Sequence, residues 1–311
     1  MQIVVFMPKI HNRDYFYKYT DIEAATANII HNSFRFSSPK TFNDPFDVQF
    51  DLHPTFTKEE LAEGLFLRTK KFLETGEGIG SHFASPTGVK FSEVIKKLKK
   101  LIDSGMIPIE EALQEIKEAS REGSEAIFEG FPRFHSEIRG HFEDVAVFCV
   151  SEDPTNLLMW SHYANSHKGV VLKLKVNEET DNFLCAADPV SYQQEMPKYS
   201  PKETFLDQSF GLKSNQEDIH KAFKDLVITK ASNWSYEKEW RVIIPSVLRN
   251  GESFRDFSLG KGDLEQVIFG CQIDVNTKTE LEALLKKFHP ETQIIQARKS
   301  DLNFELNFEP I

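Results

Sequence analysis

Residues 156–176 read NLLMWSHYANSHKGVVLKLKV and join a polar, aromatic segment directly to an apolar one. The apolar part, 169–176, is rich in valine and leucine, which is typical of a strand. Upstream, Ser151 is followed by two acidic residues, a pattern common at helix N-caps. We therefore expect a short helix over 152–164, a turn at 165–169 and a buried strand after it.

Strand patterns recur on both sides of this stretch. Alternating or apolar runs predict strands at 14–20, 34–39, 144–151, 239–245 and 253–259. A helix over 21–34 is expected to begin at Asp21 as its N-cap. The C-terminal part reads as strand LEQVIFG, helix TKTELEALLKKFH, strand TQIIQA and an alternating tail, LNFELNF.

Residues 57–141 differ, because their apolar residues recur at helical spacing. Strands at both ends with helices between them predict an α+β fold with a mainly antiparallel sheet. We expect a single domain over 1–311, with a helical insertion at about 57–141.

Composition limits the classes of function. The formal net charge of −11 argues against simple electrostatic binding to nucleic acid or anionic lipid. No apolar run approaches the ~18 residues that a membrane helix needs. The first residues have no basic leader, so we expect a cytoplasmic protein without membrane association.

The first candidate site lies in MWSHYANSH. On a helix, Trp160 and Tyr163 share a face, and Tyr163 reaches His167 if the helix persists. His162 points elsewhere. An active site, a metal site and an ordinary helix-to-strand junction all remain open. We expect no metal, because His162 and His167 are five residues apart and no further ligand completes the pair.

The second candidate site is WSYEKEWRVII. Glu237, Glu239 and Arg241 alternate, so in a strand their side chains share one face. An exposed charged stripe on an edge strand is the ordinary interpretation. Aromatic neighbours at Trp234 and Trp240 support another, because a carboxylate walled by aromatic rings has a perturbed pKa and recurs in catalysis.

A third polar cluster interrupts the early aromatic strands. Lys18 and Tyr19 lie in YKYT, and Asn43 and Asp44 lie in FNDPFD. Lys18 is either a phosphate contact or a side chain that reaches solvent.

These motifs together resemble a known family. FRFSSPKTFNDPFD, VFCVSEDPTNLLMWSHYANSHKGVVLKL, WSYEKEWRVII and VIFG are similar, in order and spacing, to the bacterial family called domain of unknown function 2971. The resemblance implies a bacterial protein of a kind found with phage-defence and toxin genes.

The order of the motifs also resembles that of ADP-ribosyltransferases. This resemblance implies a split, mainly antiparallel sheet and a Glu-x-Glu motif whose last glutamate contacts the nicotinamide ribose. That residue is Glu239 here, Glu237 precedes it, and Tyr163 is the candidate to stack on nicotinamide. Lys18 or Arg241 would then meet the pyrophosphate.

We therefore expect NAD-dependent ADP-ribosyl transfer or NAD hydrolysis, as a bacterial toxin or antiphage effector, with NAD as the substrate. The expected catalytic residues are Glu239, Glu237, Tyr163 and His162. The expected cofactor-binding residues are Lys18, Tyr19, Asn43, Asp44, Trp160, His167 and Arg241. Expected partners are a small-molecule or nucleotide ligand and a protein or nucleic-acid acceptor. Two alternatives stay open: a non-enzymatic binding or sensor protein, and a hydrolase or nuclease that uses His162, His167 and Asp44 or Asp47.

Overall fold

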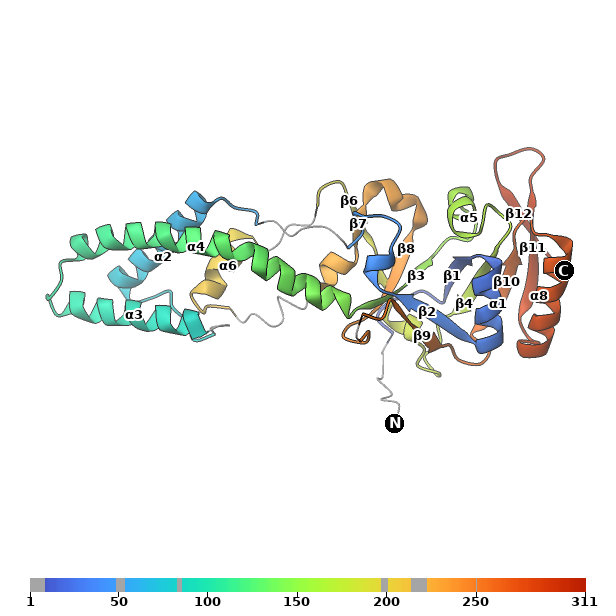
Figure 1. Ribbon diagram of the computed structural model, residues 1–311, viewed down its shortest axis with the longest axis horizontal. Helices are drawn as coiled ribbons and strands as arrows, with labels where there is room; N and C mark the ends of the chain where they lie inside the picture. Colours follow the sequence, from blue (N-terminus) through green and yellow to red (C-terminus); the bar gives the residue numbers. More distant parts are fainter. Residues whose placement is uncertain (1–8, 49–53, 83–85, 197–200, 214–222, 250) are drawn as a thin grey trace. The chain divides into compact units, whose positions relative to one another are not determined.

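A computed structural model describes residues 9–48, 54–82, 86–196, 201–213, 223–249 and 251–311 (Figure 1). The chain divides into two compact units. The first comprises residues 1–49, 141–195 and 228–311, and the second comprises 50–140 and 196–227. The first unit contains the sheet and the second unit consists mainly of helices.

The sheet of the first unit is open, and ten described strands form it. They are β1 (Tyr15–Thr20), β2 (Ser33–Ser37), β3 (Ala146–Ser151), β4 (Val170–Lys175), β5 (Asp188–Pro189), β8 (Glu239–Ile244), β9 (Phe254–Ser258), β10 (Leu264–Phe269), β11 (Gln293–Lys299) and β12 (Leu306–Pro310). Their order is β12-β11-β10-β4-β1-β3-β2-β9, and β8 pairs with β3 and β5. Only β10 and β11 are parallel among these pairs of described strands. The predicted α+β class with a mainly antiparallel sheet is confirmed.

The sheet changes partners at β3. β1 pairs with β4 along its whole length but with β3 only at Tyr17 and Ser151. β3 instead pairs with β8 over six positions, from Ala146 with Ile244 to Ser151 with Glu239. β1 and β3 therefore separate beyond their single paired position, and side chains from both strands line the space between them.

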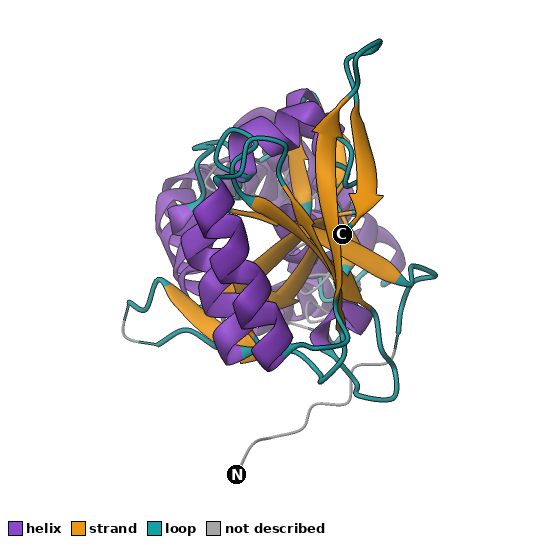
Figure 2. Cartoon of the chain, turned by 90° about the vertical axis from the view of Figure 1, so that its right-hand side faces the viewer, coloured by secondary structure: helices purple, strands orange, loops and turns teal. Residues whose placement is uncertain are grey.

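The two faces of the sheet are covered differently. Helices α1 (Ile22–His31) and α8 (Val275–Phe288) lie side by side and bury Ile29 and Leu285 against β1, β4 and β10. Asp21 caps α1 by accepting a hydrogen bond from the Ala24 amide at 2.8 Å, which confirms the predicted N-cap. Trp160 belongs to the core cluster on the other face. Figure 2 shows the twisted sheet, and in both views the turn between β11 and β12 projects beyond it.

The helix in the opening stretch is shorter than predicted. α5 spans Leu157–Tyr163, and its N-cap is Asn156, whose side chain accepts from the amides of Leu158 and Met159. The predicted N-cap, Ser151, is instead the last residue of β3. The prediction missed this because Ser151 is still paired to β8, and its hydroxyl donates to the Glu237 carbonyl at 2.6 Å.

The first unit also has shorter elements. Strands β6 (Ser191–Gln193) and β7 (Thr229–Ala231) form a separate parallel pair. Single 3₁₀ turns occur at Pro39–Thr41, Phe183–Ala186 and Ser232–Glu237.

The second unit is built from helices α2 (Lys58–Thr75), α3 (Pro86–Asp103), α4 (Ile109–Glu143, which ends in the first unit) and α6 (Lys202–Ser209). A capping box between Thr57 and Glu60 begins α2. Gly64 lets Leu206 of α6 approach α2, because a Cβ there would lie 2.5 Å from that side chain. The helical structure predicted for 57–141 is confirmed by α2, α3 and α4, whereas α6 was not predicted. No helix among the described residues has both the length and the apolar character needed to cross a membrane.

Candidate functional site

A cavity of about 210 Å³ lies where β1 and β3 separate. Six of the predicted site residues line it: Lys18, Tyr19, Asn43, Tyr163, Glu237 and Glu239. They come from β1, the segment after β2, α5, the 3₁₀ turn Ser232–Glu237 and the start of β8. Ligand pockets commonly measure ~300–1,000 Å³, so this cavity suits a single ring or a small molecule.

Five buried charged side chains form one connected cluster beside the cavity: Asp47, Lys230, Glu237, Glu239 and Arg241. Lys230 Nζ lies 2.6 Å from Glu237 Oε2, 2.8 Å from Glu239 Oε2 and 3.5 Å from Asp47 Oδ2. Arg241 donates to Glu239 Oε1 at 2.8 Å and to Asp47 Oδ2 at 2.6 Å. We call this group the ion cluster.

The ion cluster is held away from water. Arg241 is 0% exposed and Glu237 is 2% exposed. Buried ions lose their hydration, and this cost is offset only when hydrogen-bonded partners surround them. The partners here come from strand β8, from Glu237 in the 3₁₀ turn before it, from Lys230 on β7 and from Asp47 in the segment after β2. The position of each charge therefore depends on elements that are far apart in the sequence.

The two glutamates of the motif have different environments. Both oxygens of Glu239 accept hydrogen bonds from cations, and its backbone amide donates to the Tyr192 hydroxyl. Burial acts to raise the pKa of Glu239, but Arg241 and Lys230 outweigh it and hold that pKa well below its usual range. Glu239 is therefore held as an ionised carboxylate by its two cationic partners.

Glu237 is less strongly stabilised as an anion. Burial raises the pKa of Glu237 to about 7, although Lys230 and the Tyr163 hydroxyl partly oppose this. Tyr163 donates to Glu237 Oε1 at 2.6 Å. This carboxyl can therefore hold or release a proton near neutral pH, and it lines the cavity.

The backbone around Glu237 differs from the prediction. Glu237 ends the 3₁₀ turn Ser232–Glu237, and only Glu239 and Arg241 are in strand β8. Lys238 between them has φ +45°, a left-handed conformation. This reversal, and not strand alternation, brings Glu237 to the same lysine as Glu239.

Lys18 extends from β1 into the gap beside β3. Its Nζ donates to the Cys149 carbonyl at 2.9 Å and lies 4.9 Å from the centre of the Phe148 ring. Burial lowers the pKa of Lys18, and Glu239 only partly counters this effect.

The other predicted site residues lie outside this cavity. Asp44 accepts from Trp234 Nε1 at 2.6 Å, and Trp160 is fully buried, with its indole donating to the Pro154 carbonyl. His162 is exposed, with its ring near those of Trp234 and Tyr236. Arg241 does not line the cavity but donates to Glu239 and Asp47, which do.

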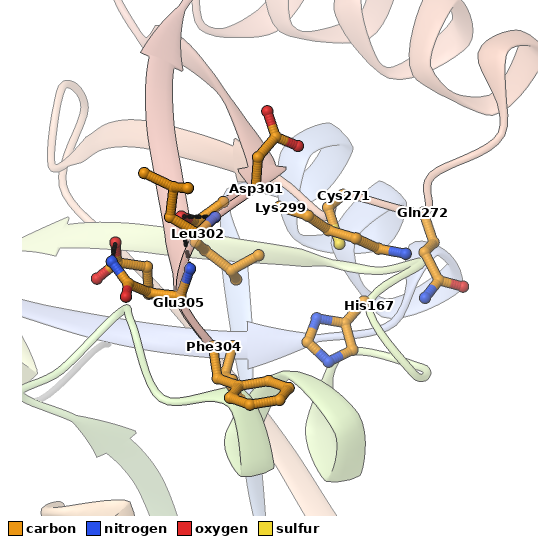
Figure 3. A pocket seen from close by; sticks show the side chains of 12 residues that line it. His167, Cys271, Gln272, Lys299, Asp301, Leu302, Phe304 and Glu305 are labelled. Atoms are coloured by element: carbon orange, nitrogen blue, oxygen red, sulfur yellow. Dashed lines mark hydrogen bonds between the residues drawn. The ribbon is translucent and has the colours of Figure 1, made fainter.

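His167 lines a second cavity, of about 440 Å³, beside the turn between β11 and β12. α5 ends at Tyr163, and residues 165–167 have positive φ, so the expected helical contact between Tyr163 and His167 does not form. The His167 ring stacks on Trp160, and its Nδ1 is buried without a hydrogen-bond partner. Figure 3 shows His167, Lys299 and Gln272 around one space, with Phe304 at its edge. His162 and His167 are therefore not brought to one site.

In the part of the chain that the structure describes, no group of three or more His, Cys, Asp or Glu side chains is arranged to hold a metal ion.

Lys230 and Cys149, which line the first cavity, were missed as site residues, and so was Tyr192, whose hydroxyl accepts from the Glu239 amide. Lys230 is in a short strand, TKA, whose local pattern carries no sign of buried charge. Asp47 was expected only in the hydrolase alternative, although it pairs with both cations of the ion cluster.

The fold and the site together define a mixed α+β protein with a buried ion cluster beside a small cavity. Residues 159–242 match the model of a protein family described as "Protein of unknown function (DUF2971)". This match supports the family resemblance seen in the sequence motifs. The matched segment includes Tyr163, Lys230, Glu237, Glu239 and Arg241. No curated protein and no solved structure matches the chain.

Proposed function

We propose that the protein cleaves the bond between nicotinamide and ribose in NAD and passes ADP-ribose to water or to an acceptor. The observation that carries this proposal is the meeting of Glu237, Glu239 and Tyr163 at one cavity. Cleavage of such a bond builds positive charge on the ribose, as in glycoside hydrolysis, and a fixed carboxylate stabilises it.

The two carboxyl groups have complementary roles in this proposal. Glu239 is held ionised by Arg241 and Lys230, so it supplies a fixed negative charge beside the cavity. Glu237 has a pKa of about 7, so it can accept a proton from the attacking water or hydroxyl. Tyr163 holds Glu237 through its hydroxyl and offers its ring to nicotinamide.

The sheet topology is consistent with an ADP-ribosyltransferase-like split sheet, which we propose as the finer class of this fold. β1 and β3 pair at one position and then separate, and the cavity lies in that gap. The first strand, the segment before β4 and the Glu-x-Glu motif meet there, in the order that the resemblance implies.

The volume of the cavity sets the binding mode. About 210 Å³ accommodates the nicotinamide ring and part of its ribose, whereas a whole dinucleotide requires more. The pyrophosphate and adenosine would therefore extend outside the cavity, and a protein or nucleic-acid acceptor would approach from the same side. A role as a bacterial toxin or antiphage effector in the cytoplasm belongs to this proposal and rests on the family resemblance.

One observation favours a second candidate, a non-enzymatic binding or sensor protein. Both oxygens of Glu239 are already engaged by Lys230 and Arg241. A carboxylate held by two cations in this way is also suited to fixing the wall of a recognition pocket, without a part in catalysis.

Incubation of the purified protein with NAD, followed by measurement of released nicotinamide, separates the two candidates. We expect Glu237→Gln to lower the rate by on the order of 10²-fold. Glu309→Gln changes an exposed carboxylate and is the matched control. Release that is equal in wild type and Glu237→Gln would contradict the role of Glu237. If wild type releases no nicotinamide and NAD does not shift its melting temperature, the transferase proposal fails.

A further inference from the structure

Lys18 and Lys230 are both lysines on the wall of the first cavity, but their surroundings are opposite. Lys230 contacts three carboxylates within 3.5 Å. Lys18 forms no ion pair with any described residue, and its hydrogen bond goes to the Cys149 carbonyl at 2.9 Å. Its other close neighbour is the face of the Phe148 ring.

This environment disfavours an ammonium group. A charged amine deep in a protein needs a counter-ion, because burial removes its hydration. One carbonyl and one aromatic ring provide only part of that stabilisation. A neutral amine loses much less on burial and can still donate the hydrogen bond to Cys149.

The charged and titratable groups around Lys18 do not reverse this balance. Those on the same cavity wall are Arg35, Asp47, Cys149, Lys230, Glu237 and Glu239, together with the phenols of Tyr17, Tyr19 and Tyr163. The three carboxyl groups are already bound to Lys230, and two of them to Arg241 as well. Burial lowers the pKa of Lys18, and the attraction of Glu239 offsets only part of this.

We propose that Lys18 is an uncharged, nucleophilic amine that forms an imine with a small aldehyde or ketone bound in the cavity. This activity is separate from NAD cleavage and requires no nicotinamide release. A lysine that forms no ion pair, in a pocket that removes its hydration, is the arrangement that activates amines for such chemistry.

The reaction balances without an oxidant or reductant. The Nζ lone pair forms a bond to the carbonyl carbon, and the π electrons of the carbonyl move to its oxygen. A proton passes from nitrogen to that oxygen, giving a carbinolamine. A second proton on the hydroxyl lets it leave as water, and the C=N bond forms as the remaining N–H proton is lost. Glu237, on the same cavity wall, is suited to donate and recover this proton.

The experiment is reductive labelling of the full chain with propanal and cyanoborohydride near pH 7, with the label at each lysine measured by peptide mass spectrometry. An ordinary lysine has roughly 0.04% of its amine unprotonated at pH 7. We expect Lys18 to be labelled at least ~10-fold faster than the exposed Lys97 and Lys168 in the same sample. Lys230, held by carboxylates, is expected to label more slowly than either.

A pH series completes the test. Between about pH 6.5 and about pH 8.5, the rate at an ordinary lysine rises ~10-fold per unit, whereas the rate at Lys18 should rise less steeply. The advantage of Lys18 should also disappear in denaturant. Labelling of Lys18 no faster than that of Lys97, or a ~10-fold rise per pH unit, would overturn the proposal. Neither result depends on whether the protein cleaves NAD.

Discussion

The two cavities of the first unit are built in different ways. The smaller one, between β1 and β3, is walled by the ion cluster, whose members are at least nine-tenths buried. The larger one lies beside the turn between β11 and β12, where Leu302 is 91% exposed and Phe304 is 100% exposed. In the smaller cavity, paired charges fix the geometry of the wall. Removal of one charged side chain therefore takes an ion-pair partner from another. In the larger cavity, these two apolar side chains are so exposed that their removal breaks almost no contacts.

This difference predicts that substitution of Arg241 lowers the free energy of unfolding the most. Arg241→Met removes one of the two cations that contact both Glu239 and Asp47, and leaves Lys230 to balance three buried carboxyl groups. Breaking a buried ion pair on one side typically costs about 3–5 kcal/mol, so we expect a fall of that size in the free energy of unfolding, measured with denaturant.

Arg298→Met is the matched control, because Arg298 and Glu309 form an ion pair that is more than half exposed on both sides. The control should change the free energy of unfolding by about 1 kcal/mol or less. An equally small effect at Arg241 would show that the ion cluster does not contribute to stability as inferred.

Substitution of Tyr163 is expected to lower the free energy of unfolding by a smaller amount. Tyr163→Phe removes the hydrogen bond to Glu237 Oε1 and leaves that carboxyl buried beside Lys230. Hydrogen bonds to charged groups contribute about 1.5–3 kcal/mol, and we expect a loss in that range by denaturant unfolding. Tyr17→Phe is the control, because Tyr17 lines the same cavity and its hydroxyl has no hydrogen bond to a described residue. Equal losses in the two variants would contradict the importance of the Tyr163 contact.

The pH dependence of stability tests Glu237 separately. The folded protein raises the pKa of Glu237 to about 7 from the usual 4.5, so between these values it retains a proton that the unfolded chain has released. The free energy of unfolding should therefore fall as pH rises through this window, and Glu237 contributes on the order of 3 kcal/mol of that fall. Glu237→Gln should flatten the profile between about pH 4.5 and about pH 7. Parallel profiles for the two proteins would contradict the raised pKa.

The same contrast explains what the sequence predicts and what it does not. The strands and the cap at Asp21 follow from local patterns, since alternation and one side chain determine them. The start of α5 was misplaced because Ser151 still pairs with β8, a contact formed across 88 residues of chain to Glu239. Lys230 escaped notice as a site residue because only tertiary structure brings it to Glu237 and Glu239.

The motif around Glu237 shows the limit of the strand rule. Alternation correctly placed Glu239 and Arg241 on one face of β8. It did not anticipate the left-handed backbone at Lys238, because lysine has no preference for that conformation. Strand alternation predicted that the two glutamates lie close together. They do, but only Glu239 lies in the strand to which that rule applies.

The smallest effect is expected at the turn beside the second cavity. Phe304 is fully exposed, so Phe304→Ser removes no buried surface, and we expect a change within about 0.5 kcal/mol in the free energy of unfolding. Phe34→Ala, in the core beneath α1, should cost about 3–5 kcal/mol in the same assay. A loss of more than about 1 kcal/mol at Phe304 would mean that its ring packs against the cavity wall in solution. The second cavity would then be a closed pocket like the first, and the contrast between the two would fail.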